Sequence, residues 1–329
     1  MPDPLSYMKA MVSAAIVSAL CVLAMVAARR TTDRSWMNTA CVTGLGLGLA
    51  VGCGILSLIP AWPPASALDR FLSMVVPASL GIELLAGIRR VPAWLLRCLR
   101  ICLITTIPVI LLHGSVYLSG ADTEWPLWRT YTAMALCSAL LTGIWALLAL
   151  LSRRSPGVSI SFAVCLTTQC AGATVMMAGY IKGGAVALPL VATLMASTIA
   201  IGLIAKRSGE PADFRTSTTL GIGVVSLFGV LFIGRFFGRL STGSGLTLLL
   251  APLCCWATEM PQLRHRKPWV VGSLRMALVT VPLLLVLVQA KREFDRDMAP
   301  LLGMEGPAPR ELTAEIGDRT AGMRKSALP

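Results

Sequence analysis

The stretch that decides the fold reads FLSMVVPASLGIELLAGIRRVPAWLLRCLRICLITTIPVILL from Phe71 to Leu112. It consists of two apolar runs joined by a short basic turn that contains a proline. An α-helix needs about 20 mostly apolar residues to cross the hydrocarbon core of a bilayer. The stretch therefore predicts a hairpin of two membrane-spanning helices.

A second stretch, from Thr247 to Leu285, repeats this pattern and reads TLLLAPLCCWATEMPQLRHRKPWVVGSLRMALVTVPLLL. In both stretches the first run contains a proline and ends near a glutamate. A basic turn with a proline follows, and the second run carries a tryptophan, an arginine, a threonine and a proline in that order. The matched pairs are Pro77 and Pro252, Glu83 and Glu259, Pro92 and Pro268, Trp94 and Trp269, Arg100 and Arg275, Thr105 and Thr280, and Pro108 and Pro282. The hairpin therefore predicts an internal repeat.

The composition places the whole chain in a membrane. Of its 329 residues, 55% are hydrophobic and 14% are charged, whereas a soluble domain carries about 25% charged residues. The sequence predicts an all-α integral membrane protein of about ten transmembrane helices in contact with the lipid bilayer. The ten apolar runs cover residues 7–28, 36–59, 71–88, 94–118, 128–151, 158–180, 184–205, 217–237, 245–257 and 268–290, and the ninth is the shortest.

The repeat extends beyond the hairpin to the first two runs. The pair Arg29–Arg30 after the first run matches Lys206–Arg207 after the seventh, and glycines of the second run match glycines of the eighth. Helices 1–4 are thus predicted to recur as helices 7–10. Because six spans separate the copies, both insert in the same, parallel orientation. The predicted organisation is a first four-helix repeat (1–120), a connecting helix pair (121–182), a second four-helix repeat (183–290) and a polar, mobile tail (291–329).

Basic residues predict the orientation in the membrane. The loops after odd-numbered runs and the adjoining helix ends hold most of them, namely Arg29, Arg30, Arg34, Arg89, Arg90, Arg97, Arg100, Arg153, Arg154, Lys206, Arg207, Arg215, Arg264, Arg266 and Lys267. The N-terminus and the other loops hold only Lys9, Arg70, Arg129, Lys182, Arg235 and Arg239. By the positive-inside rule, both termini lie outside the cytoplasm of a bacterial inner (plasma) membrane. The net charge of +13 is then a topology signal, and no nucleic-acid partner is expected.

Each hairpin carries one glutamate and one arginine inside its apolar runs. Glu83 and Arg100 lie at similar distances from the first turn, and Glu259 and Arg275 bracket the second turn in the same way. Each pair therefore reaches the same depth on neighbouring helices. Charges in hydrocarbon pair with one another or face a polar pathway. The pairs are read either as structural ion pairs or as carboxylates that bind a proton or a cationic substrate.

Two further features stand out inside the runs. Gly44, Gly48 and Gly52 form one face of the second run, and this spacing lets helices pack closely in lipid. The matching glycines of the eighth run are Gly221, Gly223 and Gly229. Near the midpoint of the sixth run, Gln169 needs a hydrogen-bond partner, which is either another helix or a substrate.

No metal site, cofactor or catalytic motif is expected. All ten cysteines lie within the apolar runs, Cys98 and Cys102 at the entry of the fourth, and in such runs cysteine acts as a small hydrophobic residue. No C-x-x-C occurs. The two histidines, His113 and His265, are far apart in the predicted topology. Nucleotide-binding, zinc-protease and serine-hydrolase motifs are missing from the sequence. The chain is therefore not predicted to be an enzyme.

These observations favour a secondary transporter or permease for a small solute, with Glu83 and Glu259 as coupling residues and Gln169 as a substrate contact. A non-catalytic membrane scaffold or assembly protein is the alternative, in which the charges are only ion pairs. An intramembrane enzyme acting on lipid-linked substrates is a third, less favoured, reading. The sequence identifies neither the solute, nor the coupling ion, nor the oligomeric state.

Overall fold

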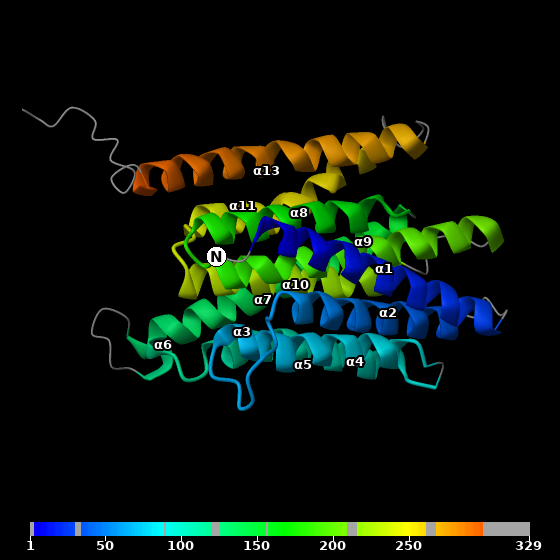
Figure 1. The fold of residues 1–329 in the computed structure, drawn as a ribbon, viewed down its shortest axis with the longest axis horizontal. Helices are drawn as coiled ribbons and strands as arrows, with labels where there is room; N and C mark the ends of the chain where they lie inside the picture. The colour runs from blue at the N-terminus through cyan, green and yellow to red at the C-terminus, as the bar shows by residue number, and fades with distance from the viewer. Residues whose placement is uncertain are drawn as a thin grey trace, which may run out of the picture. The chain divides into compact units, whose positions relative to one another are not determined.

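The computed structural model describes residues 3–29, 34–88, 90–119, 126–155, 157–208, 216–260 and 268–298. Within these ranges every regular element is a helix (Figure 1). The elements are α1 (Pro4–Arg29), α2 (Arg34–Ile55), α3 (Ala67–Arg70), η1 (Phe71–Val75), α4 (Val76–Ala86), α5 (Ala93–Leu112), α6 (Val116–Ser119), α7 (Leu127–Arg154), α8 (Ser159–Met177), α9 (Ile181–Ser208), α10 (Thr216–Phe237), α11 (Thr242–Leu250), η3 (Ala251–Glu259) and α13 (Pro268–Met298).

Eight of these helices are long and apolar enough to cross a membrane, namely α1, α2, α5, α7, α8, α9, α10 and α13. Large apolar side chains remain exposed along the outer helices, among them Leu20 of α1 and Leu285 of α13. Water would make such surfaces costly, whereas lipid chains can cover them. The chain is therefore a polytopic, all-α membrane protein, and its apolar helices contact the bilayer.

The third and ninth predicted spans are helical but broken into segments. In the third, the π-helical segment η1 lies between α3 and α4; in the ninth, α11 passes into the 3-10 segment η3. Pro77 lies at the start of α4 and Pro252 at the start of η3. Proline has no N–H and crowds the preceding turn, so the hydrogen-bond pattern changes at both places. That these two segments also span the membrane, which would make ten spans, stays a prediction.

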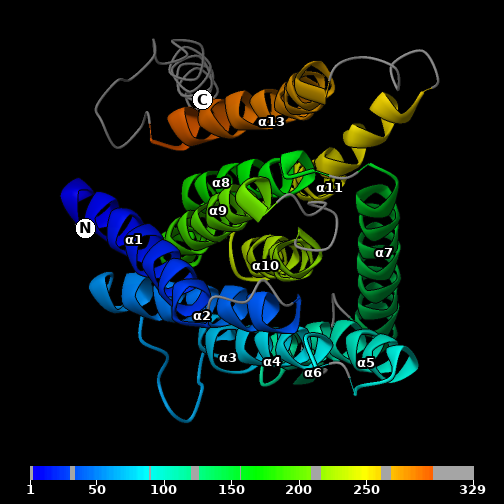
Figure 2. The ribbon, with the colours of Figure 1, turned by 90° about the vertical axis from the view of Figure 1, so that its right-hand side faces the viewer.

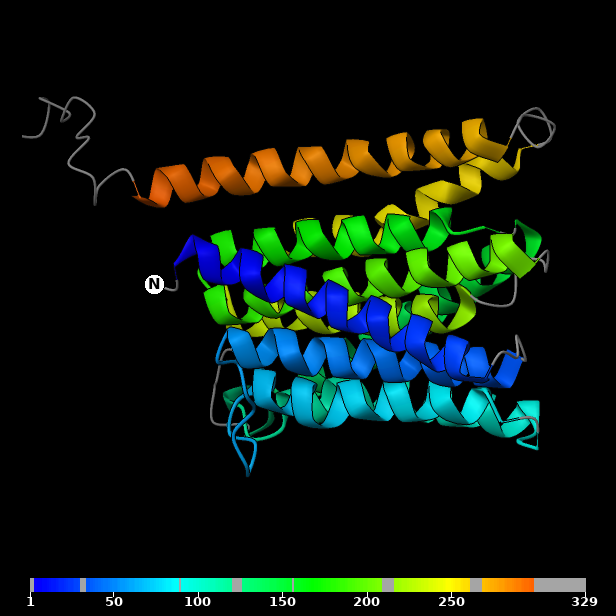
Figure 3. The same cartoon turned by 45° about the vertical axis from the view of Figure 1, so that its right-hand side comes forward.

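Helix α10 is the most enclosed of the eight long helices in residues 1–288. In Figure 2, in which α7 is seen largely from the side, α10 lies among α2, α4, α7, α8 and α9, and it packs against all five. Of the residues in its apolar 18-residue stretch, 83% are buried, compared with 50% for α2 and 22% for α1. Helix α1 packs against α2 and α9 near the surface (Figure 3). The eighth predicted run thus forms the centre of this unit.

The predicted glycine face of α2 lies where α2 meets α1 and α9. A Cβ added at Gly48 would stand 2.6 Å from the backbone oxygen of Ala14 and 2.6 Å from Cγ2 of Thr193. Cβ atoms do not approach other atoms so closely, so only glycine fits at this crossing. Gly44 is similarly close to α1, and Gly52 to both α1 and α9.

The three glycines of α10 each face a different neighbour. A Cβ at Gly221 would lie 2.9 Å from a carboxylate oxygen of Glu83, and one at Gly223 would lie 2.9 Å from a valine of α8. A Cβ at Gly229 would overlap the ring of Phe71. Small residues thus allow α10 to remain central while helices on several sides pack against its backbone.

Two helices end earlier than the sequence predicted. The second run was expected to extend to residue 59, but α2 ends at Ile55, and Ser57 adopts a φ of 54°. The fourth was expected to extend to residue 118, but α5 ends at Leu112, and Gly114 adopts a φ of +66°. A left-handed residue ends the helical hydrogen-bond pattern at both places, although the apolar sequence continues.

The chain divides into two compact units, Met1–Val288 and Gln289–Pro329. Helix α13 continues into the second unit as far as Met298, whereas the sequence assigned residues 291 onward to a mobile tail. Good helix formers explain the difference, and Gln289 donates from Nε2 to Glu293 Oε1 at 3.2 Å across one turn. The start of the predicted tail is therefore helical, and its remainder lies outside the described residues.

Candidate functional site

The first hairpin pairs Glu83 of α4 with Arg100 of α5. Arg100 donates from Nε to one carboxylate oxygen at 3.0 Å and from Nη2 to the other at 2.8 Å. This two-point geometry matches a planar guanidinium to a planar carboxylate. The Glu83 side chain is 6% exposed and that of Arg100 is 20% exposed, so the carboxylate is the deeper member of the pair.

Helices α2, α7 and α10 enclose this first pair. Asn38 of α2 donates from Nδ2 to the backbone oxygen of Glu83 at 2.5 Å and accepts a hydrogen bond from the hydroxyl of Thr218 on α10. The guanidinium carbon of Arg100 lies 5.2 Å from the ring centre of Trp145 on α7, a cation–π distance. The pair thus sits at a junction of five helices.

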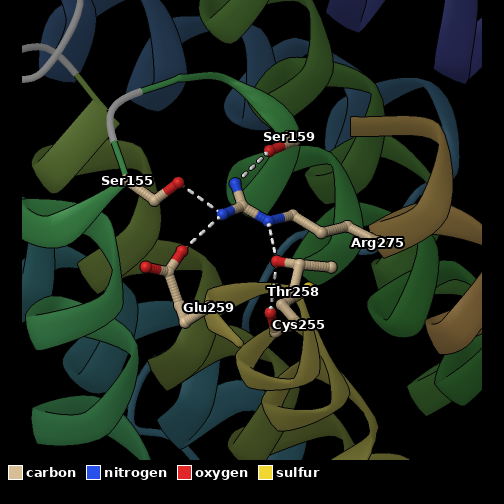
Figure 4. A network of polar contacts seen from close by, with 6 residues as sticks. All are labelled: Ser155, Ser159, Cys255, Thr258, Glu259 and Arg275. Carbon is tan, nitrogen blue, oxygen red and sulfur yellow. Dashed lines mark hydrogen bonds and ion pairs between the residues drawn. The ribbon is translucent and has the colours of Figure 1, made fainter. Parts of the chain in front are cut away.

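The second hairpin pairs Arg275 of α13 with Glu259 at the end of η3 (Figure 4). Arg275 Nη2 donates to Glu259 Oε1 at 2.9 Å. Its Nε donates to the hydroxyl of Thr258 at 2.8 Å and its Nη1 to the hydroxyl of Ser159 at 3.0 Å. A fourth hydrogen bond runs from Nη2 to the hydroxyl of Ser155. One guanidinium therefore connects α13 to η3, to α8 and to the segment before α8.

The two pairs bury opposite charges. In the second pair the Arg275 side chain is 3% exposed and that of Glu259 is 15% exposed, the reverse of the order in the first pair. Loss of Arg100 would leave a buried carboxylate, whereas loss of Glu259 would leave a buried guanidinium with hydroxyl partners only.

A cavity of 1140 Å³, called the α13 cavity below, extends from the second pair toward the middle of the helices. It lies between α13, α8, α9 and α1, and most of its wall is apolar, including Phe162, Leu166 and Met276. Its polar lining at one end comes from the end of α7, the start of α8, the end of η3 and α13. These residues include Arg154, Ser155, Ser159, Thr258, Glu259 and Arg275.

Gln169 of α8 lines the α13 cavity away from that polar end. Its side-chain oxygen is buried and accepts no hydrogen bond from the residues that the structure describes. An unmade hydrogen bond of a buried polar atom costs about 1–3 kcal/mol. Among the predicted site residues, Gln169 is therefore the one whose hydrogen-bonding capacity the described part of the chain leaves open.

A second cavity, of 870 Å³, adjoins the first ion pair and is called the α5–α7 cavity below. Its lining includes Glu83 and Arg100 together with Asn38, Arg97 and Arg153. On another side of the same pair, a cavity of 20 Å³ is bordered by Ser79, Gly221 and Val225 among others. That volume is large enough for about one water molecule. Glu83 and Arg100 therefore lie between a large cavity and a much smaller one.

The structure gathers the predicted site residues into two places. Glu259, Arg275 and Gln169 line the α13 cavity, and Glu83 and Arg100 line the α5–α7 cavity. The packing glycines lie at helix crossings, apart from the α13 cavity. Several residues used in the sequence predictions lie outside the described residues, namely Arg30, Arg89, Arg215, Arg264, His265, Arg266 and Lys267.

Sequence reasoning missed the partners that come from other helices. Asn38 is a polar residue in an apolar run, and this contrast could have marked it. Trp145 was indistinguishable from other apolar residues of the fifth run. Ser155 and Ser159 flank a short loop, and nothing in their spacing relates them to Arg275. Only the packing of helices distant in sequence reveals these contacts.

No metal-binding group of three or more His, Cys, Asp or Glu residues occurs within the described ranges. The absence of a metal or cofactor stays a prediction for the whole chain. Comparison with known proteins finds no matching family model, no matching curated protein and no matching solved structure. The function is therefore inferred from this chain's own geometry.

Proposed function

We propose that this protein is a secondary transporter or permease for a small solute and that it has no catalytic activity. The observation that carries the proposal is the α13 cavity. It begins at a charged pair, is bordered by helices from both halves of the chain, and reaches Gln169. A transporter needs polar side chains within the membrane that can bind its substrate. A protein that only packs in the bilayer does not need them.

The two carboxylates are proposed to couple transport to proton movement. A proton that binds Glu83 would neutralise it and remove the charge that holds Arg100. The freed guanidinium is already stacked on Trp145 and borders the α5–α7 cavity, so it can turn toward that cavity. Protonation of Glu259 would likewise remove the charge beside Arg275 at the α13 cavity, where three hydroxyl groups still hold the guanidinium.

The parallel repeat is part of this proposal. Both hairpins contain a helix break at a proline, Pro77 in one and Pro252 in the other, and both close on a Glu–Arg pair. Helix breaks beside charged residues are a common arrangement at transport sites. Alternating access would then come from rocking of one four-helix unit against the other.

Replacing Glu83 and Glu259 together by glutamine is expected to abolish proton-coupled uptake. Glutamine keeps the shape and the hydrogen-bonding oxygen but cannot exchange a proton near neutral pH. The measurement follows a pH dye inside proteoliposomes while a panel of small solutes is added outside. Wild-type protein should acidify the interior with at least one solute, and the double variant should match protein-free liposomes.

Glu293→Gln is the matched control for this experiment, because Glu293 lies on α13 outside both ion pairs and is exposed. It should retain the wild-type rate. If the double variant acidifies the liposome interior as fully as the wild type does, Glu83 and Glu259 have no role in coupling. If no solute moves protons with wild-type protein, proton-coupled transport itself is rejected.

One observation favours the scaffold alternative. Both oxygens of Glu83 are engaged by Arg100, and Arg275 makes four hydrogen bonds. Groups so fully satisfied suit permanent links between helices. Under this reading the same double variant would be less stable than the wild type, and the wild type itself would transport no solute.

We also propose the orientation that the basic loops predict, with both termini outside the cytoplasm of a bacterial inner membrane. A cysteine introduced in place of Arg292, which is exposed in the second unit, should be labelled in intact cells by a membrane-impermeant maleimide. The unmodified chain, with its ten native cysteines, provides the background. Labelling only after the membrane is opened would reverse the orientation.

A further inference from the structure

The lining of the α13 cavity is polar at one end and apolar along its length. The polar end lies where α7 and η3 end and where α8 and α13 begin. Beyond it, Leu166, Val191 and Met195 line the wall between α8 and α9. A fully polar solute would satisfy the end but not the wall, because burying polar groups against apolar surface is unfavourable.

The charges of this lining do not cancel. Arg154 and Arg275 are basic, and Glu259 is the single acidic residue among the lining residues. Glu259 is paired with Arg275. Arg154 is exposed, stacks on the ring of Trp256 at 5.5 Å, and forms no ion pair with any described residue. The polar end therefore has one positive charge in excess and complements an anionic group.

Gln169 determines how long an occupant must be. It lies ten residues along α8 from Ser159, and a helix rises about 1.5 Å per residue, so the two side chains are about 15 Å apart along the helix axis. The buried Gln169 oxygen needs a donor. An occupant that meets both ends must therefore be elongated, with a hydrogen-bond donor remote from its charged head.

We propose that the α13 cavity binds an elongated amphiphile with an anionic head group at Arg154 and a hydrogen-bond donor that reaches Gln169. The cavity volume of 1140 Å³ exceeds what a small polar solute would fill. A phosphate or carboxylate head would accept from Arg154 and from the hydroxyls of Ser155 and Ser159. The role of this amphiphile as the transported substrate rests on the proposed transport function, whereas the binding site itself does not.

The test measures binding of radiolabelled ω-hydroxydodecyl phosphate to the full-length protein in phosphatidylcholine nanodiscs, with empty nanodiscs as the blank. One saturable site per chain is expected. Dodecyl phosphate, which lacks the terminal hydroxyl, should bind about threefold to tenfold more weakly, as one net hydrogen bond implies. In Gln169→Leu that difference should vanish, and the two probes should bind alike.

The head group is tested with two neighbouring arginines. Arg154→Gln should weaken both probes about threefold to fivefold, the upper part of the range for an exposed charge. Arg153→Gln should leave binding unchanged, because Arg153 is also exposed but lines the α5–α7 cavity instead. Equal loss of affinity in both arginine variants would overturn the site. So would tighter binding of the hydroxylated probe than of dodecyl phosphate by Gln169→Leu, or complete displacement of the probe by inorganic phosphate.

Two sources could supply such an amphiphile, namely the bulk phospholipid and a separate lipid-like solute. Nanodiscs that contain phosphatidylglycerol distinguish them. Competition by phosphatidylglycerol would identify membrane lipid as the occupant, which keeps the binding site but removes its role in transport. If a solute drives proton uptake but Arg154→Gln and Gln169→Leu do not change probe binding as expected, this inference alone is overturned. The transport proposal then still stands.

Discussion

Replacing Arg100 by methionine is expected to lower the free energy of unfolding by about 3–5 kcal/mol, because it leaves a buried charge without its partner. The Glu83 side chain is only 6% exposed. Asn38 binds its backbone oxygen and not its carboxylate. The carboxylate must then stay charged without its paired cation or take up a proton on folding. Denaturant unfolding of the purified protein in detergent micelles measures the change.

Arg97→Met is the matched control, because Arg97 lies one turn earlier on α5, is exposed, and has no ion-pair partner within the described residues. Its effect should stay within about 0.5 kcal/mol. Combining Arg100→Met with Glu83→Gln should recover part of the loss, since the remaining amide carries no charge. An Arg100→Met variant as stable as the wild type would show that the pair contributes nothing to the fold.

Replacing Gly48 by alanine is expected to destabilise the protein by about 1–3 kcal/mol through overpacking. The new methyl group would collide with the backbone oxygen of Ala14 and with the methyl group of Thr193, each 2.6 Å away. A backbone atom cannot move aside by a rotamer change. Helix α1 would therefore have to shift away from α2, and the Thr193 side chain or α9 would have to move as well. The same unfolding measurement in micelles detects the loss.

Gly54→Ala is the control for this substitution, because Gly54 is on the same helix and a Cβ there would meet nothing within 4 Å. Without a clash, alanine should stabilise α2 by about 0.5–1 kcal/mol through its higher helix propensity. The two variants are therefore expected to change stability in opposite directions. The same sign in both would mean that helix propensity, and not the close crossing, determines the effect at Gly48.

The sequence was most informative about contacts within one hairpin. Glu83 meets Arg100, and Glu259 meets Arg275, because equal distances from a short turn place side chains at equal depth. Glycines with helical spacing lie at close helix crossings for a similarly local reason. The ends of the helices were less predictable, since the apolar sequence continues past Ile55 and Leu112, whereas α2 and α5 end at these residues.

Contacts between helices distant in sequence could not be predicted in this way. The hydrogen bond from Thr218 to Asn38 and the two from Arg275 to serines depend on the rotation and offset of whole helices. Many packings place the same residues at the same depth but on different faces. For the same reason, no periodicity indicated which helices enclose the α13 cavity.

By itself, the amino-acid sequence determined that the chain is an all-helical membrane protein and which charges share a hairpin. Both follow from local quantities, namely hydropathy over one span and rise per residue from one turn. Only the tertiary structure decided that Glu83 is the buried member of one pair and Arg275 of the other. It also decided that the Gln169 oxygen, which lines a cavity, has no hydrogen-bond partner among the residues that the structure describes. Burial depends on what surrounds a side chain, and those surroundings come from helices that the local sequence does not specify.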